Sequence, residues 1–335
     1  MFISNDEKKL IETICMAIKK HNRFLLTTHQ LPDGDGLGCE LAFFSMLTRL
    51  DKKAVIVNEM PARPVFDFLP NVSRIINISQ YKQLHLSPEV IMVFDCSVGE
   101  RIGKLAKFIS GKQVIINIDH HEGNDLFGDI NWIDASRSSV GEMCFFIIEN
   151  LKCLDRSIAE CLYTSILTDT GSFRYHFDRR TIAVVEKILR CGIEPEIIAD
   201  KIYHNNSVSC LRLVGYALSR LHYDEEMRVA WTVLTENIYK KTGAAEQDTE
   251  IVADMIGSMK DVDFVFLVKE RKDEIKFSLR SRRDFNVRII AEHFGGGGHN
   301  SASGFSIYKM SIHRALSTFL KFLRDNKQNG KKSNC

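Results

Sequence analysis

Residues 24–36 have the sequence FLLTTHQLPDGDG. The run Phe24 to Thr28 is apolar enough to form a buried parallel strand, and a turn that carries His29, Asp33 and Asp35 follows it directly. Further runs of the same kind occupy residues 54–57, 90–94 and 114–118. Helical patterns are expected at about 6–20, 37–50, 138–151, 156–168 and 180–191. This alternation predicts an α/β fold in which helices flank a parallel sheet.

The second half of the chain has a different order of elements. Strands are expected at 229–234, 264–269, 275–280 and 303–307, and helices near 249–259, 286–293 and 312–323. We therefore expect a smaller α+β domain after a helical connector, with an active-site cleft between the two domains. The expected limits are 1–193 for the first domain, 194–221 for the connector, 222–325 for the second domain and 326–335 for a disordered tail.

Composition narrows the class of protein. A length of 335 residues suits two domains, and 45 basic against 43 acidic side chains give a net charge of +2. That balance argues against a protein that coats long nucleic acid. Nine cysteines without a C-x-x-C pair predict reduced thiols in a cytoplasmic protein. The chain shows neither a signal-peptide pattern nor an apolar run long enough for a membrane span, so no membrane partner is expected.

Acidic and histidine side chains follow several of the predicted elements. Asp95 comes after the strand at 90–94, and Asp119-His120-His121 comes after the strand at 114–118. Asp169-Thr170-Gly171 follows the helical run 156–168. Parallel strands place their ligands at their carboxyl ends, and this mixture of donors suits two neighbouring divalent cations, with Mn²⁺ favoured over Mg²⁺ and zinc not excluded. The turn at residues 32–36, taken alone, would more often be structural than functional, so the repetition of the pattern carries the prediction.

A glycine run, Gly295 to Gly298, precedes His299. It follows a helical pattern instead of a strand, which argues against a dinucleotide-binding fingerprint. It could form a flexible loop, or its backbone N–H groups could bind a phosphate together with Arg280 on a nearby predicted strand. Arg174 could contact a substrate phosphate or could lie on the surface without a function.

Taken in order, these motifs resemble those of DHH phosphoesterases that carry a C-terminal DHHA1 domain, which include nanoRNases and cyclic-dinucleotide phosphodiesterases. The resemblance covers about residues 20–320. The matching motifs are H-x-x-P-D-x-D-G at 29–36, Asp95, D-H-H at 119–121, D-T-G-x-F at 169–173 and GGGGH at 295–299.

The resemblance implies a role for each matching residue. One cation would be held by His29, Asp33 and Asp95, and the other by Asp35, Asp95, His120 and Asp169. Asp119 would orient His120, and His121 would face the substrate phosphate as a hydrogen-bond donor or proton carrier. Asp95, Asp119 and His121 would thus form the catalytic group, with a water between the two cations as the nucleophile. Substrate would also contact Arg280, Ser281, Gly296, Gly297, Gly298 and His299. Arg174 is a further candidate contact from its position just beyond Asp169, and not from the resemblance.

The function expected from this resemblance is hydrolysis of very short oligonucleotides, such as pApA, to mononucleotides, with pAp 3′-phosphatase activity beside it. Hydrolysis of cyclic di-AMP is the alternative within the same enzyme class. An inactive nucleotide-binding module is a third hypothesis, and the complete set of expected metal ligands argues against it. Short nucleotides are the expected partners, long nucleic acid is not, and the resemblance also implies a homodimer.

Overall fold

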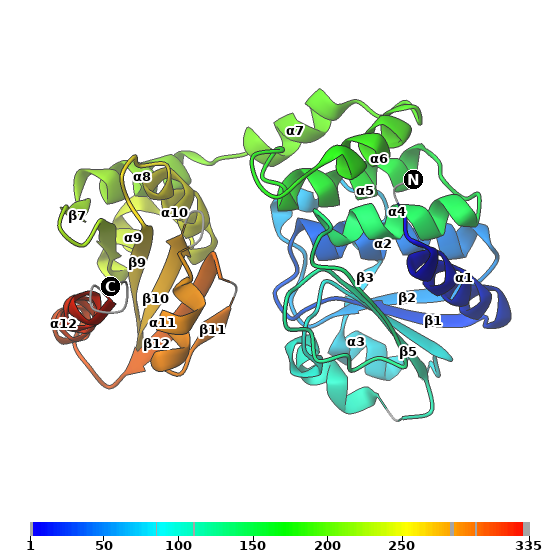
Figure 1. Cartoon of the computed structure of the whole chain (residues 1–335), viewed down its shortest axis with the longest axis horizontal. Coiled ribbons are helices and arrows are strands. Elements are labelled where there is room, and N and C mark those ends of the chain that lie inside the picture. The colour runs from blue at the N-terminus through cyan, green and yellow to red at the C-terminus, as the bar shows by residue number, and fades with distance from the viewer. Residues whose placement is uncertain (1–2, 85, 110, 282–284, 299, 331–335) are drawn as a thin grey trace. The chain divides into compact units, whose positions relative to one another are not determined.

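The computed structural model describes residues 3–330 apart from 85, 110, 282–284 and 299. The chain divides into two compact units, Met1–Asn205 and Asn206–Cys335 (Figure 1). The stretch 194–221, expected to connect two domains, contains α7 (Pro195–Tyr203) and α8 (Val208–Ser219), and the division falls between these helices.

Unit 1 is built on a six-stranded, fully parallel sheet in the order β3-β2-β1-β4-β5-β6. The strands are β1 (Arg23–Thr27), β2 (Lys53–Asn58), β3 (Ile75–Asn77), β4 (Val90–Phe94), β5 (Val114–Asp119) and β6 (Ile130–Ile133). The chain moves outward from β1 to β3, returns to β4 on the other side of β1, and continues to β6. The direction of winding therefore reverses between β1 and β4, and ligands of open α/β sheets bind outside the carboxyl ends of strands at such a point.

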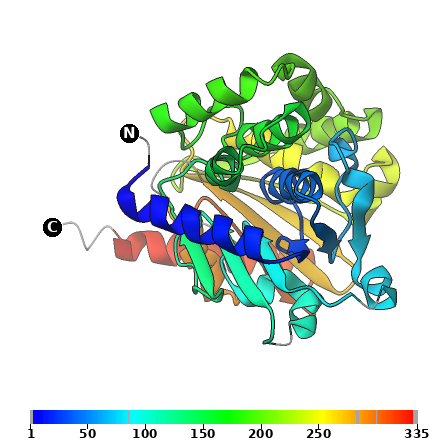
Figure 2. The same ribbon diagram turned by 90° about the vertical axis from the view of Figure 1, so that its right-hand side faces the viewer.

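Helices cover both faces of this sheet, as Figures 1 and 2 show. One face is covered by α1 (Asn5–Lys20), α2 (Gly34–Arg49), α4 (Val140–Asn150) and α5 (Arg156–Asp169), with α6 (Arg179–Leu189) and α7 packed against them. The other face carries α3 (Ile78–Gln83) and the 3₁₀ segment Gly99–Phe108, and the short 3₁₀ turns Pro64–Phe66 and Val72–Arg74 follow β2. Because both faces are covered, β4 is buried at all five positions, as a continuous apolar run predicts.

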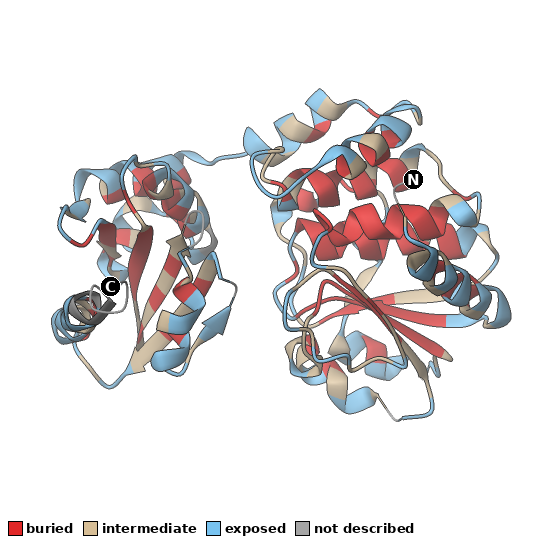
Figure 3. Ribbon diagram, viewed as in Figure 1, coloured by how far each residue is buried: buried red, intermediate tan, exposed pale blue. Residues whose placement is uncertain are grey.

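The helices α2 and α5 pack closely together in the core. A Cβ atom added at Gly38 of α2 would lie 2.5 Å from the carbonyl oxygen of Cys161 in α5. Both helices are buried over most of their length (Figure 3). A glycine at position 38 therefore sets how near the start of α2 comes to α5.

The α/β class and the four strands predicted in unit 1 are confirmed. The sequence pattern did not identify β3 and β6, which are the two edge strands and are only three and four residues long. Short edge strands have few apolar positions, so their periodicity is weak.

Unit 2 contains a mixed sheet in the order β11-β12-β10-β9-β8-β7. Its strands are β7 (His222–Asp224), β8 (Val229–Leu234), β9 (Phe264–Arg271), β10 (Glu274–Ser281), β11 (Gly297–Gly298) and β12 (Ala302–Tyr308). Its helices besides α8 are α9 (Glu236–Thr242), α10 (Thr249–Gly257), α11 (Val287–His293) and α12 (Ile312–Gly330), and Glu246–Asp248 forms a 3₁₀ turn. Two apolar cores form, one between the sheet and α11 with α12, and the other against α8, α9 and α10.

The four strands predicted in this half are confirmed, and the short strands β7 and β11 were not foreseen. The helix expected at 312–323 continues to Gly330, so the residues from 326 to 330 are helical where a disordered tail was expected. Residues 324–330 contain no proline, which would break the helix. The last five residues of the chain lie outside the described part.

No helix in the described part of the chain is both long enough and apolar enough to cross a membrane.

Candidate active site

The motif after β1 enters helix α2 at the reversal point of the sheet. Asp33 is the N-cap of α2, and its carboxylate accepts hydrogen bonds from the backbone N–H groups of Asp35 (3.0 Å) and Gly36 (3.1 Å). A Cβ atom at Gly34 would lie 2.3 Å from Oγ1 of Thr168, and one at Gly36 would lie 2.2 Å from Oγ1 of Thr28. Close packing against these two hydroxyls thus requires glycine at both positions of this turn.

The first group of candidate metal ligands joins the ends of β1 and β4. Nε2 of His29 lies 3.6 Å from Oδ2 of Asp33 and 3.4 Å from Oδ2 of Asp95. The hydroxyl of Thr28 donates a 2.8 Å hydrogen bond to the carbonyl of Phe94, which ties the two strand ends together. His29 and Asp95 are buried, whereas the Asp33 side chain is 52% exposed. This group combines a fixed, buried pair with one carboxylate at the surface.

The second group joins α2, β5 and α5. Nε2 of His120 lies 3.7 Å from Oδ2 of Asp35 and 3.4 Å from Oδ2 of Asp169. Asp169 is the last residue of α5. The hydroxyl of Thr170, the next residue, donates to the carbonyl of Ile166 and accepts from the backbone N–H of Phe173, so the D-T-G-x-F motif shapes the end of this helix.

Asp95 stands between the two groups. Its Oδ2 faces His29, and its Oδ1 lies 3.8 Å from Nε2 of His120 and 3.4 Å from Nδ1 of His121. The backbone of Asp95 is left-handed, with φ of 53°, a conformation that Asp and Asn tolerate better than most residues. A carboxylate that presents one oxygen to each group has the geometry of a bridging ligand.

The carboxylate of Asp35 is held from several sides. Its two oxygens accept hydrogen bonds from the backbone N–H groups of Val140 (2.8 Å) and Gly141 (3.1 Å) at the start of α4. The hydroxyl of Ser165 also donates to it. Helix N-termini favour anions, so this position stabilises a buried negative charge.

Proton affinities in this cluster are strongly perturbed. Burial and then the charge of Asp95 raise the pKa of Asp35 to about 7. Burial also raises the pKa of Asp169 well above its usual value. Burial would lower the pKa values of His29 and His120, but the carboxylates around each imidazole raise them to about 10. Without cations, bound protons therefore offset the negative charge of the crowded carboxylates. A cation that binds here has to displace these protons.

The residues present fit two divalent cations. The ligand atoms of each group lie within 4.8 Å of one another, and bonds of roughly 2.0–2.6 Å to one cation place opposite ligand atoms about 4–5 Å apart. Four carboxylates, from Asp33, Asp35, Asp95 and Asp169, match the charge of two divalent ions. Mixed carboxylate and imidazole donors are compatible with Mn²⁺ and with related ions.

The orientation of the two histidines differs from what the resemblance implied. Nδ1 of His121 lies 2.6 Å from Oδ1 of Asp119, whereas Nδ1 of His120 lies 3.2 Å from the carbonyl of Arg137. Asp119 therefore orients His121 and not His120. Since a carbonyl only accepts, it fixes the ring proton of neutral His120 on Nδ1 and leaves Nε2 able to bind a cation.

Asp119 is itself held in place by Asn124. The side-chain amide of Asn124 donates a 2.7 Å hydrogen bond to Oδ2 of Asp119 and a 2.9 Å bond to Oδ1 of Asn117. Burial would raise the pKa of Asp119, but the hydrogen bond and charge of His121, together with the bond from Asn124, keep it below its usual value. Asp119 is thus an ionised partner for the imidazole of His121.

Arg174 follows the end of α5, but its contacts are local. Its Nε donates a 2.7 Å hydrogen bond to the carbonyl of Gly171, and its guanidinium lies over the ring of Tyr175 at 5.5 Å. The backbone at Ser172 and Phe173 is left-handed. Its expected contact with substrate stays a prediction.

The residues expected to bind substrate in unit 2 gather at one end of its sheet. Arg280 pairs with Ala302 across β10 and β12, and Gly298 pairs with the next residue of β12, Ser303. The hydroxyl of Ser281 donates a 3.2 Å hydrogen bond to the carbonyl of Asn300. His299 lies outside the described residues.

The glycine run is more ordered than the sequence suggested. The backbone N–H of Gly296 donates a 2.8 Å hydrogen bond to the carbonyl of Ala291 at the end of α11, and Gly297 and Gly298 form strand β11. A Cβ atom at Gly296 would lie 2.2 Å from the carbonyl oxygen of Gly304. The expectation that Gly296 offers an open N–H group to a phosphate is therefore wrong, because this group caps a helix.

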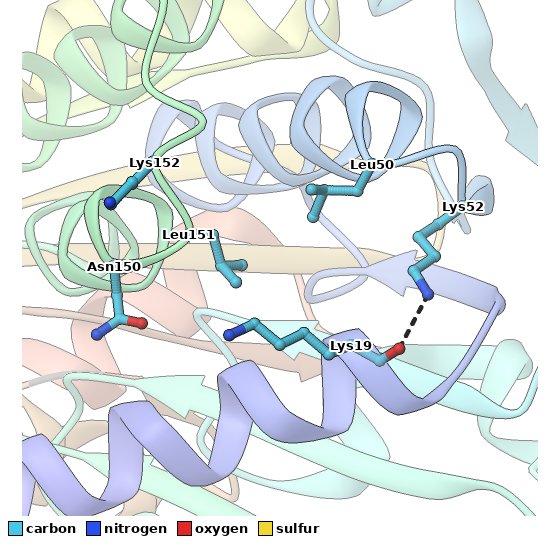
Figure 4. Close-up of a pocket in the computed structure, with 6 residues that line it drawn as sticks. All are labelled: Lys19, Leu50, Lys52, Asn150, Leu151 and Lys152. Atoms are coloured by element: carbon cyan, nitrogen blue, oxygen red, sulfur yellow. Dashed lines mark hydrogen bonds between the residues drawn. The ribbon is translucent and has the colours of Figure 1, made fainter.

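A pocket lies away from the candidate ligands, near the ends of α1, α2 and α4 (Figure 4). Its volume is about 380 Å³, and it is lined by Lys19, Leu50, Lys52, Asn150, Leu151 and Lys152. The ammonium of Lys52 donates to the carbonyl of Lys19 at the end of α1. Lysines at helix C-termini compensate the negative end of the helix dipole, which accounts for their presence.

Sequence patterns missed several residues that shape the site. Arg137, Asn124 and Ser165 each contact a candidate ligand or its partner, and Ser165 does so across 130 positions of the chain. A weak signal existed for Asn124, a polar residue three positions after His121. Arg137 gave no signal, because its contribution to His120 is made by a backbone carbonyl.

Comparisons with known proteins match each unit to a family model. The DHH family, N-terminal domain, matches residues 23–166, and the DHHA1 domain matches residues 228–326. The bifunctional oligoribonuclease and PAP phosphatase of Thermus thermophilus is 26% identical over 322 residues, which cover 96% of this chain and 94% of that protein. The protein of the same name from Bacillus subtilis is 25% identical, with 90% and 93% of the two chains covered.

Among solved structures, an exopolyphosphatase-related protein from Bacteroides fragilis aligns with a TM-score of 0.92 and 27% identity. The alignment covers 97% of this chain and 98% of that one. Both family models match in the order that the motifs predicted, and relatives align along nearly the whole chain. The chain therefore belongs to the DHH family of phosphoesterases, with a DHHA1 domain after its DHH domain.

Proposed function

We propose that this phosphoesterase hydrolyses very short oligonucleotides to mononucleotides, that it also removes the 3′-phosphate of pAp, and that it uses two divalent cations, with Mn²⁺ as the preferred ion. The observation that carries the proposal is the coincidence of two facts. Relatives named oligoribonuclease and PAP phosphatase align over both domains, and Asp95 stands between two complete groups of candidate ligands.

The proposed metal ligands are those named from the sequence. His29, Asp33 and Asp95 would hold one cation, and Asp35, Asp95, His120 and Asp169 the other. Support comes from the distances within each group and from the carbonyl of Arg137, which leaves Nε2 of His120 able to bind. When bound, the two cations supply Lewis acidity and lower the pKa of a water molecule, so that hydroxide is available at neutral pH.

His121 and Asp119 are proposed to manage the proton. Hydrolysis forms a bond between a water oxygen and phosphorus and breaks the ester bond to the leaving oxygen, which then needs a proton. Asp119 accepts the Nδ1 proton of His121, which directs the proton-transfer chemistry to Nε2. Protonated His121 would donate from Nε2 to the leaving oxygen. Asp119 stabilises this charged form because it is buried and ionised.

Unit 2 is proposed to bind the other end of the substrate. Arg280 is the main candidate because a guanidinium can bind a phosphate through two parallel hydrogen bonds. Ser281, Gly297, Gly298 and His299 are proposed to line the same place, and Arg174 of unit 1 to contact a substrate phosphate.

The test is a product assay with Mn²⁺ on pApA, RNAs of two to five nucleotides, a 24-nucleotide RNA, pAp and cyclic di-AMP. Asp95→Asn keeps a residue that tolerates the left-handed backbone but removes the charge between the two groups. Asp51→Asn is the matched control, because Asp51 is also left-handed and lies in the exposed turn after α2.

We expect rapid loss of the short RNAs and pAp with wild-type protein and with Asp51→Asn, and a loss of at least about 10³-fold with Asp95→Asn. Faster hydrolysis of cyclic di-AMP than of linear substrates would move the activity to cyclic dinucleotides. Absence of turnover on all substrates with the wild-type protein would overturn the proposal.

A further inference from the structure

The segment between β6 and α4 holds ligands of one candidate cation from two directions. The carbonyl of Arg137 accepts from Nδ1 of His120 at 3.2 Å. Three and four residues later, the N–H groups of Val140 and Gly141 bind the carboxylate of Asp35. His120 and Asp35 both belong to the second group, so a single stretch of backbone sets the positions of two of its three members.

The side chain of Arg137 anchors this stretch from the opposite side. It is completely buried, and its guanidinium donates to the carboxylates of Asp134 (Nε to Oδ2, 3.1 Å), Glu142 (Nη1 to Oε1, 2.9 Å) and Glu7. It also lies 5.2 Å from the centre of the Phe146 ring. A buried guanidinium with planar, directional donors allows little rotation of the residue that carries it.

Glu7 connects this anchor to the first helix of the chain. One of its oxygens accepts a 2.7 Å hydrogen bond from the backbone N–H of Ser4, which completes the capping box of α1, and the other accepts from Arg137. The Glu7 side chain is only 19% exposed. A contact between residues 130 positions apart thus links α1 to the backbone beside His120.

The consequence for the metal site follows from geometry. If the backbone at Arg137 rotates, its carbonyl no longer points at Nδ1 of His120, and the N–H groups of Val140 and Gly141 shift against Asp35. Partners that orient a ligand in this way contribute to metal affinity although they do not touch the ion. The members of the first group come from other segments, His29 and Asp33 from the turn after β1 and Asp95 from the end of β4.

We propose that Arg137 is a positioning residue for the cation held by Asp35, Asp95, His120 and Asp169, and that Glu7 of α1 is the partner that keeps it in place. The inference rests on the proposed two-metal function. It predicts that loss of the Glu7–Arg137 contact weakens the binding of one cation and leaves the binding of the other unchanged.

The experiment measures Mn²⁺ binding by the paramagnetic resonance signal of free Mn²⁺, with no substrate present. Glu7→Gln keeps an oxygen for the Ser4 N–H but removes the negative partner of Arg137, and Arg137→Lys removes the planar fork that reaches three carboxylates. Glu89→Gln is the matched control. Glu89 is also partly buried, accepts from the backbone N–H groups of Asn22 and Arg23, and contacts the Arg23 guanidinium at 3.4 Å.

We expect two Mn²⁺ ions on the wild-type protein and on Glu89→Gln. In Glu7→Gln one ion should bind about 10-fold more weakly, and in Arg137→Lys by a larger factor, with the other ion unchanged. His120→Gln should remove the same ion, and adding Glu7→Gln to it should not change the ion that remains. A role in overall stability alone would weaken both ions or neither.

Equal weakening of both ions in Glu7→Gln, an equal effect of Glu89→Gln, or wild-type binding in both Glu7→Gln and Arg137→Lys would each overturn the inference. If Arg137→Lys does not fold, Mn²⁺ binding by Glu7→Gln and by the double variant Glu7→Gln/His120→Gln tests the inference. A wild-type protein that binds no Mn²⁺ would overturn the proposed function and the inference that rests on it. The outcomes named above overturn the inference alone, because in each of them the wild-type protein still binds two Mn²⁺ ions.

Discussion

Replacing Glu40 with glutamine is expected to stabilise the protein increasingly as the pH rises above 5. Glu40 lies in α2 with no exposed surface, and its Oε2 accepts a 2.9 Å hydrogen bond from the side-chain amide of Asn58 at the end of β2. Within the part of the chain that the structure describes, Oε1 of Glu40 and Oδ1 of Asn58 have no hydrogen-bond partner. Two buried acceptors therefore face a shortage of donors, which disfavours the ionised acid.

The magnitude follows from the pKa. Burial raises the pKa of Glu40 from 4.5 to about 8, against the opposing effects of Asn58 and the charge of His29. The folded state then binds a proton more tightly than the unfolded state, so this contribution to stability is complete below pH 4.5 and is lost as the pH rises to about 8. At about 1.4 kcal/mol for each pH unit, the loss is at most roughly 5 kcal/mol. Glutamine does not ionise, and its amide can donate to Oδ1 of Asn58.

The assay is urea unfolding between pH 5 and pH 9, followed by circular dichroism, with chelator and again with Mn²⁺. The advantage of Glu40→Gln over wild type should be smallest at pH 5 and grow to several kcal/mol by pH 9. Glu59→Gln is the control, because Glu59 has a lowered pKa and is bound by the backbone N–H of Lys104. The free energy of unfolding of Glu59→Gln, plotted against pH, should run parallel to that of the wild-type protein above pH 6. Parallel curves for Glu40→Gln from pH 5 to pH 9 would refute the reasoning.

Two further substitutions test the proton donor and the helix packing. Asp119→Asn should lower kcat by about 10²–10⁴-fold, because the charge that stabilises protonated His121 is lost, while Mn²⁺ affinity stays near wild type; an equal loss of Mn²⁺ affinity in a metal titration would contradict this role. Gly38→Ala should destabilise unit 1 by roughly 1–3 kcal/mol, since its Cβ would lie 2.5 Å from the Cys161 carbonyl oxygen. An unchanged thermal unfolding midpoint would show that α2 and α5 can move apart without cost.

Much of the fold was predictable because its signals are local. The strands β1, β2, β4 and β5 are apolar runs flanked by turn residues, and a parallel sheet buries such runs on both faces. The place of the candidate ligands was predictable for the same reason. Residues directly after parallel strands share one edge of the sheet, so Asp33, Asp95 and His120 had to lie near one another whichever helices intervened.

Partners of these side chains were not predictable in the same way. His120 and Arg137 are 17 positions apart, and Asp35 and Val140 are 105 apart. The carbonyl and N–H groups that bind His120 and Asp35 belong to the backbone, which every residue type provides. No pattern of residue types can therefore reveal them. The expectation that Asp119 orients His120 was wrong because the partner of His120 is such a backbone group, the carbonyl of Arg137. The side chain of Asp119 contacts His121 instead.

The sequence by itself determined strands β1, β2, β4 and β5, that they run parallel, and at which edge of their sheet the acids and histidines collect, because apolar periodicity and strand-end position are properties of short segments. Only the tertiary structure decided which hydrogen bond orients each imidazole, why Gly34 and Gly36 must be glycines, and that the N–H of Gly296 caps α11 instead of facing a ligand. These features depend on which backbone and side-chain atoms lie within about 3 Å of one another after packing. Packing at that distance is set by the whole fold and not by any one segment.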